Sequence, residues 1–104
     1  MYSSPLSPFL LEGMDELRKC KSELEKNNLV AAQAHAEMTL KNLRDAGSGE
    51  ELDDLEVLIE LIKQNKIKEA IKLINDINSK ISQTIFMLEG TTVEKLKKEN
   101  KYKS

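Results

Sequence analysis

Side chains that could perform chemistry are few in this chain, and they stand apart from one another. Among 104 residues there is one histidine, His35, one cysteine, Cys20, and no tryptophan. A metal site or a nucleophile–base pair needs two or more such groups at a defined spacing, and the sequence has no cysteine pair, no second histidine and no Glu-x-x-His motif. Segment 47–49 is too short for a phosphate-binding loop and lacks its lysine. The sequence therefore predicts no catalytic, metal or cofactor site and no enzyme activity.

His35 and Cys20 each fit a structural role and not a catalytic one. In histidine phosphotransfer domains the phospho-accepting histidine is followed by lysine three residues later and then by glycine, whereas Met38 and Thr39 stand at those positions here. We expect His35 beside the apolar stripe of its helix, partly exposed, and Cys20 packed as a small hydrophobe on an apolar face. A His-dependent activity stays a third hypothesis, which an active His35→Ala variant would exclude.

Composition and charge favour a soluble protein of one domain. The chain is 39% hydrophobic, 33% charged and 4% aromatic, and its 16 basic and 18 acidic residues give a net charge of −2. This balance argues against a globally basic nucleic-acid binder. A single cysteine excludes an intrachain disulfide and suits a reducing compartment. No apolar run approaches the roughly 20 residues of a membrane helix. We expect a cytoplasmic protein that does not bind membranes.

The distribution of helix breakers predicts an all-α fold. Every glycine and proline lies outside two long segments, 14–46 and 50–89, which are rich in strong helix formers and lack the alternation of strands. Each segment has one five-residue jump in its apolar stripe, at Asn27-Asn28 and at Gln64-Asn65, and asparagine tolerates the left-handed conformation that ends helices. We predict a bundle of about four main helices in two antiparallel hairpins. Because neither glycine nor proline enforces the breaks, two continuous helices that dimerise into a four-helix bundle are the alternative.

The predicted bundle, residues 13–90, lies between two ends of different character. Residues 1–12 contain both prolines and are expected to form a flexible or irregular arm, although Ser7-Pro8 is also suited to an early helix start. Residues 91–104 are expected to form a short Lys-rich helix, near 92–100, and a tail. Their five lysines and two glutamates give a charge of +3. This tail supports an alternative function as a nucleic-acid-associated regulator, which the acidic body of the chain disfavours.

The two breaks also resemble each other in sequence. At an offset of 37, segment 23–28 is identical to segment 60–65 at four of six positions. The stretch from Asn65 through Ile67 to Ala70 resembles the turn and small-residue position of the tetratricopeptide class of helical repeats, which implies two helix–turn–helix units. The large aromatic and Leu-Gly positions of that class are missing here, and the spacing exceeds 34 residues. We favour a four-helix bundle in which the similarity is accidental.

The aliphatic residues of the chain are concentrated between positions 52 and 88. Stretch 57–62 has one polar residue in six, and the helix that follows carries a heptad seam interrupted by Asn78. In paired coils such an asparagine bonds to its mate, whereas at the edge of an intramolecular bundle it bonds to a side chain or water. The predicted partner-binding residues are Leu58, Leu61, Ile71, Ile74, Asn78, Ile81, Ile85 and Leu88.

These observations together predict a binding function. We expect a non-enzymatic helical protein–protein interaction module, such as an adaptor, a small chaperone or an assembly subunit. Its partner would be another protein or a second copy of the chain, in a homodimer formed through the third and fourth helices. The sequence indicates no small-molecule substrate.

Overall fold

The computed structural model describes residues 7–45, 50–90 and 93–95, and these residues are helical except in two turns and at Gly90. The four main helices are α1 (Ser7–Glu25), α2 (Leu29–Asp45), α3 (Glu50–Lys63) and α4 (Ile67–Glu89), and residues 93–95 are again helical. The predicted all-α class and the number of main helices are confirmed. Most of the predicted helix near 92–100 lies outside the described residues.

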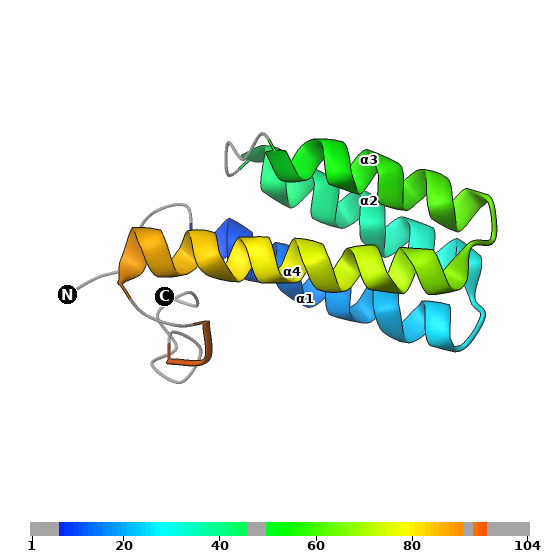
Figure 1. Ribbon diagram of the computed structural model, residues 1–104, viewed down its shortest axis with the longest axis horizontal. Coiled ribbons are helices and arrows are strands. Elements are labelled where there is room, and N and C mark those ends of the chain that lie inside the picture. The colour runs from blue at the N-terminus through cyan, green and yellow to red at the C-terminus, as the bar shows by residue number, and fades with distance from the viewer. Residues whose placement is uncertain (1–6, 46–49, 91–92, 96–104) are drawn as a thin grey trace.

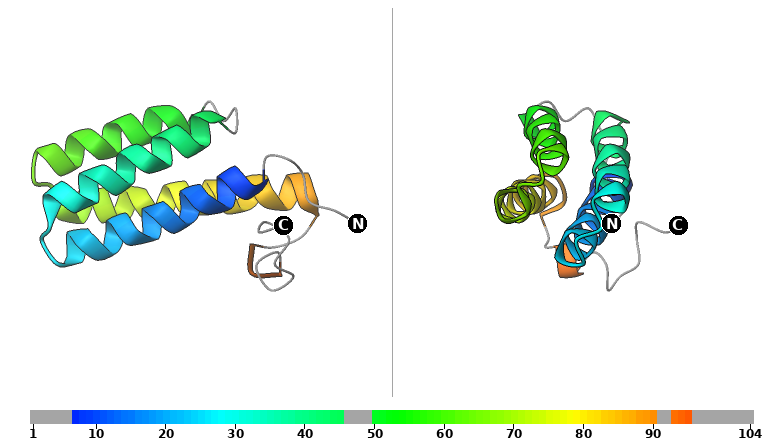
Figure 2. Two further views of the ribbon diagram at one scale, coloured as in Figure 1. Left: turned by 180° about the vertical axis from the view of Figure 1, so that it is seen from behind. Right: turned by 90° about the vertical axis from the view of Figure 1, so that its right-hand side faces the viewer.

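The helices form a closed bundle. α1 packs on α2, α2 on α3, α3 on α4, and α4 on α1, so that each helix has two neighbours around one core (Figures 1 and 2). The two hairpin turns lie at the same end of the bundle, and at the opposite end α4 extends past the other three helices. No described helix is both long and apolar enough to cross a membrane.

Both hairpins turn in the same way, on an asparagine. Asn27 and Asn65 each have a φ of 62°, in the left-handed region. The Asn27 N–H donates to the Leu24 carbonyl and the Asn65 N–H to the Ile62 carbonyl, both at 3.0 Å. The next amide in each hairpin donates five residues back, at 2.8 and 2.9 Å, which completes a Schellman motif. The predicted breaks are confirmed, and two continuous helices are excluded.

The structural repeat has a period of 38 residues, one more than the sequence alignment gave, because Asn65 is equivalent to Asn27 and not to Asn28. At this period buried positions coincide in the two halves: Leu17 with Leu55, Cys20 with Leu58, Leu24 with Ile62, and Ala32 with Ala70. Of the four identities at 37, three are polar residues around an exposed turn, where identity says little about packing, and the fourth pairs the buried Leu24 with the half-buried Leu61. Burial and the left-handed asparagine fix the true register.

The first helix begins earlier than expected. α1 starts at Ser7, so residues 7–12 are helical and do not belong to an irregular arm. Pro8 falls in the first turn, where its missing N–H would have no helical partner in any case. Leu10 and Leu11 are buried in the core, and this apolar burial stabilises the additional turn.

Gly13 is not a helix breaker but a contact residue inside α1. A Cβ atom at this position would lie 3.3 Å from Cδ2 of Leu43, closer than an ordinary van der Waals contact. The absence of a side chain therefore allows α1 and α2 to approach closely.

Gly90 does end a helix as predicted: its φ is 66° and its N–H donates to the Phe86 carbonyl at 2.7 Å.

Candidate partner-binding site

The predicted partner-binding residues do not share one outer face. Four of them, Leu58, Ile74, Ile81 and Ile85, are fully buried by the chain's own helices. Leu61 and Ile71 are half-buried against the same core, Asn78 is half-buried, and only Leu88 is exposed. Most of the heptad seam thus forms the intramolecular core, since α1 and α3 pack against α4 on either side. In this conformation the seam is a packing surface of the bundle itself, and most of it is not accessible to another chain.

Asn78 is buried on its carbonyl side. Its Oδ1 atom is inaccessible to solvent and has no hydrogen-bond partner in the described structure. The bond to a neighbouring side chain that the sequence suggested for an intramolecular bundle is therefore not made by Oδ1 among the described residues. A buried polar atom without a partner costs about 1–3 kcal/mol of stability.

Three consecutive exposed apolar side chains lie at the end of α4 that extends past the bundle (Figure 1). Phe86, Met87 and Leu88, which we call the α4 tip, are 55%, 83% and 46% exposed. Phe86 and Met87, with Ser82 and Gln83, line a hollow of about 410 Å³. Large apolar side chains that are adjacent and exposed are typical of sites that bind other macromolecules.

Two of the three tip residues were missed in the sequence because they fall outside the heptad seam. Consecutive residues of a helix are separated by about 100°, so the apolar run from Ile85 to Leu88 spans about 300° and cannot face one core. Ile85 is buried, whereas Phe86, Met87 and Leu88 are exposed. The run of four was visible in the sequence and was the signal for this surface.

α4 is longer than α2, and the tip lies in the additional part of α4. Under the 38-residue period, the last residue of α2, Asp45, corresponds to Gln83. The six residues of α4 beyond Gln83 have no counterpart in α2. The tip is therefore an addition to the repeated hairpin and not part of its core-forming unit.

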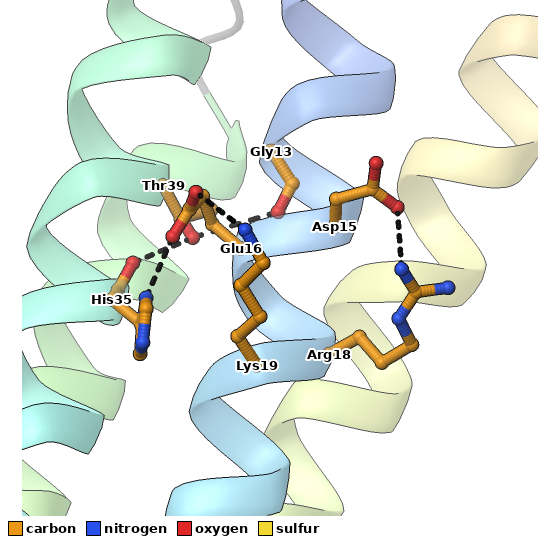
Figure 3. A network of polar contacts seen from close by, with 7 residues as sticks. All are labelled: Gly13, Asp15, Glu16, Arg18, Lys19, His35 and Thr39. Atoms are coloured by element: carbon orange, nitrogen blue, oxygen red, sulfur yellow. Dashed lines mark hydrogen bonds and ion pairs between the residues drawn. The ribbon is translucent and has the colours of Figure 1, made fainter.

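His35 belongs to a polar network between α1 and α2 (Figure 3). Its Nδ1 atom lies 2.7 Å from Oε1 of Glu16, whose other oxygen lies 3.6 Å from Nζ of Lys19. Thr39, which is fully buried, donates its hydroxyl to the His35 carbonyl at 2.9 Å and lies 3.5 Å from the carbonyl oxygen of Gly13. His35 is partly exposed, as expected, but its partner Glu16 was not foreseen. These groups connect the two helices of the first hairpin, which is a structural role.

Cys20 is fully buried on α1, as its position on an apolar face predicted. Burial raises the pKa of its thiol to about 12, because the interior disfavours the charged thiolate. At neutral pH the thiol is therefore protonated and is a poor nucleophile.

In the described part of the chain, no three His, Cys, Asp or Glu side chains are placed together to hold a metal ion. Of the Lys-rich segment, only Lys95 and its two helical neighbours are described.

Fold and surface together define a small closed four-helix bundle with a projecting apolar helix end. No protein-family model, curated protein or solved structure matches the chain.

Proposed function

We propose that this protein is a non-enzymatic helical interaction module, acting as an adaptor, small chaperone or assembly subunit, and that it binds an apolar segment of its partner through the α4 tip. The observation that carries the proposal is the exposure of Phe86 and Met87 beside a hollow that they line. Aromatic residues and methionine are enriched in interfaces, and flexible methionine adapts to irregular partners. The short length of the tip favours a transient complex over a permanent one.

The seam predicted as the dimer contact has another role in this proposal. Residues such as Ile74 and Ile81 stabilise the bundle, and a partner could reach them only if the bundle opened. Self-association, if it occurs, would use the tip. A stable dimer normally buries about 800 Å² per subunit, far more than three side chains supply. We therefore expect a different protein as the main partner and at most weak self-association.

Site-specific crosslinking tests the proposal. A photo-crosslinking amino acid is placed at position 87 or, as the matched control, at position 38, where Met38 is similarly apolar and exposed on α2. We expect a discrete heterologous product from position 87 and not from position 38. The partner identified in this way is then purified, and Met87→Glu should weaken its binding at least tenfold, or about 1.4 kcal/mol, while Met38→Glu should not.

Two results would contradict the proposal. One is the same set of crosslinked products from both positions, which would indicate non-specific contact. The other is equal affinity of the purified partner for the wild type and for Met87→Glu. Sedimentation of the wild type over a range of concentrations measures self-association separately, and circular dichroism verifies that each variant is folded.

A further inference from the structure

The methionines of the chain differ widely in their access to solvent. Met87, at the α4 tip, is 83% exposed, and Met38 on α2 is 51% exposed. Met14 on α1 is half-buried against the core, and Met1 lies outside the described residues. A dissolved oxidant has to touch the thioether sulfur in order to oxidise it. Among the described methionines, Met87 is therefore the one most open to oxidation.

Cys20 does not compete for the same oxidant in the folded protein. It is the one cysteine of the chain, and it is fully buried. Burial raises the pKa of its thiol to about 12, so that the reactive thiolate is scarce at neutral pH. Mild oxidation of the folded chain is thus directed to exposed methionine, and first to Met87.

Position 87 is a place where a change of polarity alters the surface without altering the core. Met87 lies in the part of α4 that has no counterpart in α2, and it lines the hollow of the α4 tip with Phe86. No charged residue occurs between Lys80 and Glu89. A sulfoxide oxygen is a strong hydrogen-bond acceptor, and an apolar partner would have to strip water from it.

We propose that Met87 is a reversible oxidation site whose sulfoxide converts the α4 tip from an apolar surface to a polar one. With hydrogen peroxide as the oxidant, the sulfur bonds to one oxygen while the O–O bond breaks, and the other oxygen leaves as water with both hydrogens. The sulfur loses two electrons, which the peroxide gains. Sulfoxide reductases reverse the change: two thiols become a disulfide, and the oxygen leaves as water.

The regulatory part of this inference rests on the proposed function, because oxidation can release a partner only if one binds the tip. The oxidation and the change of surface polarity are properties of the isolated chain. They are tested on the full-length protein without a partner.

Timed treatment with hydrogen peroxide, followed by trypsin digestion and mass spectrometry, tests the site. Cleavage after lysine places Met87 in peptide 81–95 and Met38 in peptide 27–41, one methionine in each. We expect the Met87 sulfoxide to form first, several-fold faster than that of Met14, with Met38 between them. Cys20 should remain a free thiol and the circular dichroism spectrum should not change. Oxidation of Met14 or Cys20 as fast as that of Met87 would overturn the assignment.

Retention of the intact protein on a phenyl matrix measures the change of surface polarity. After brief oxidation the wild type and Met38→Leu should elute earlier than before, and a sulfoxide reductase should restore their retention. Met87→Leu, which keeps an apolar side chain but has no sulfur at this position, should elute almost unchanged after the same treatment. Equal retention of the reduced and the Met87-oxidised wild type would refute the change of surface.

Failure of this inference is distinguishable from failure of the proposed function. Selective oxidation of Met87 with earlier elution, in a protein that gives no heterologous crosslink from position 87, refutes only the function. If a partner is purified through that crosslink, we expect Met87 oxidation to weaken its binding about tenfold. Equal affinity for the reduced and the oxidised protein, while Met87→Glu still weakens binding, refutes only the regulation.

Discussion

Asn78→Leu is the sharpest test of the described core. Leucine has nearly the same shape as asparagine, with two terminal atoms on Cγ, so the substitution removes polarity with little change of volume. The Oδ1 atom of Asn78 is buried and unbonded in the described structure. Replacing a buried group of this kind by an apolar group of the same shape removes its desolvation penalty.

The expected gain is about 1–2 kcal/mol in the free energy of unfolding. A fully buried unsatisfied group costs about 1–3 kcal/mol, and the lower part of that range applies because the Asn78 side chain is only half-buried. The higher helix propensity of leucine adds a few tenths of a kcal/mol. In a domain of this size each kcal/mol raises Tm by roughly 4–8 °C.

Urea unfolding followed by circular dichroism measures this gain, with an unchanged m-value as the sign that only stability has changed. Asn75→Leu is the matched control on the same helix: Asn75 is exposed and accepts one surface hydrogen bond from Lys21 at 3.3 Å. We expect its stability to change by less than about 0.5 kcal/mol. If Asn78→Leu were no more stable than Asn75→Leu, the Asn78 carbonyl would have a partner or be hydrated, and the reasoning would be refuted.

Three further predictions concern the two turns and the buried residues Thr39 and Cys20. Asn27→Ala and Asn65→Ala should each lower the free energy of unfolding in urea by about 1–2 kcal/mol, because alanine is strained at a φ of 62°. The glycine variants should lower it less, because glycine adopts this φ without strain. Unequal losses at the two sites would contradict their equivalence. Thr39→Val should cost about 1 kcal/mol through the lost hydrogen bond to the His35 carbonyl, and unchanged stability would show that this bond contributes nothing. Because the pKa of Cys20 rises from 9.0 to about 12 on folding, the unfolded chain loses that proton first. The wild type should therefore lose stability relative to Cys20→Ala as pH rises from 9 toward 12, by up to about 1.4 kcal/mol per pH unit, and parallel pH profiles would refute the shift.

The helices and turns of this fold could be predicted well from local signals in the sequence. The five-residue jumps in the apolar stripe located both turns, because a helix cannot keep one apolar face across such a jump and asparagine can adopt the required conformation. The N-terminal boundary of α1 differs from the predicted one, because the burial of Leu10 and Leu11 extends the helix back to Ser7 despite the nearby prolines. That burial depends on tertiary contacts, which local propensity does not contain.

The candidate site was harder to predict because periodicity shows that a face is apolar without showing what covers it. Ile74 and Ile81 fit a seam between two chains as well as they fit an intramolecular core, and only the positions of α1 and α3 decide between them. The Glu16–His35 pair could not be predicted from the sequence for a similar reason. Its members are 19 residues apart and meet only because the turn at 26–28 brings α1 and α2 together.

The 38-residue repeat gives a physical reason why the proposed binding surface lies on the second hairpin and not on the first. At equivalent positions the first hairpin has smaller side chains, Ala36 and Thr39 against Ile74 and Ile77, all of them buried. Small residues let α1 and α2 approach closely, and the larger isoleucines fill the core that remains. The second hairpin therefore supplies most of the aliphatic volume, and its α4, at 23 residues against 17 in α2, continues beyond the repeated unit. Ile85 in that extension still packs in the core, whereas Phe86 and Met87 are exposed, which is the physical reason to propose that these two residues make contacts outside the bundle.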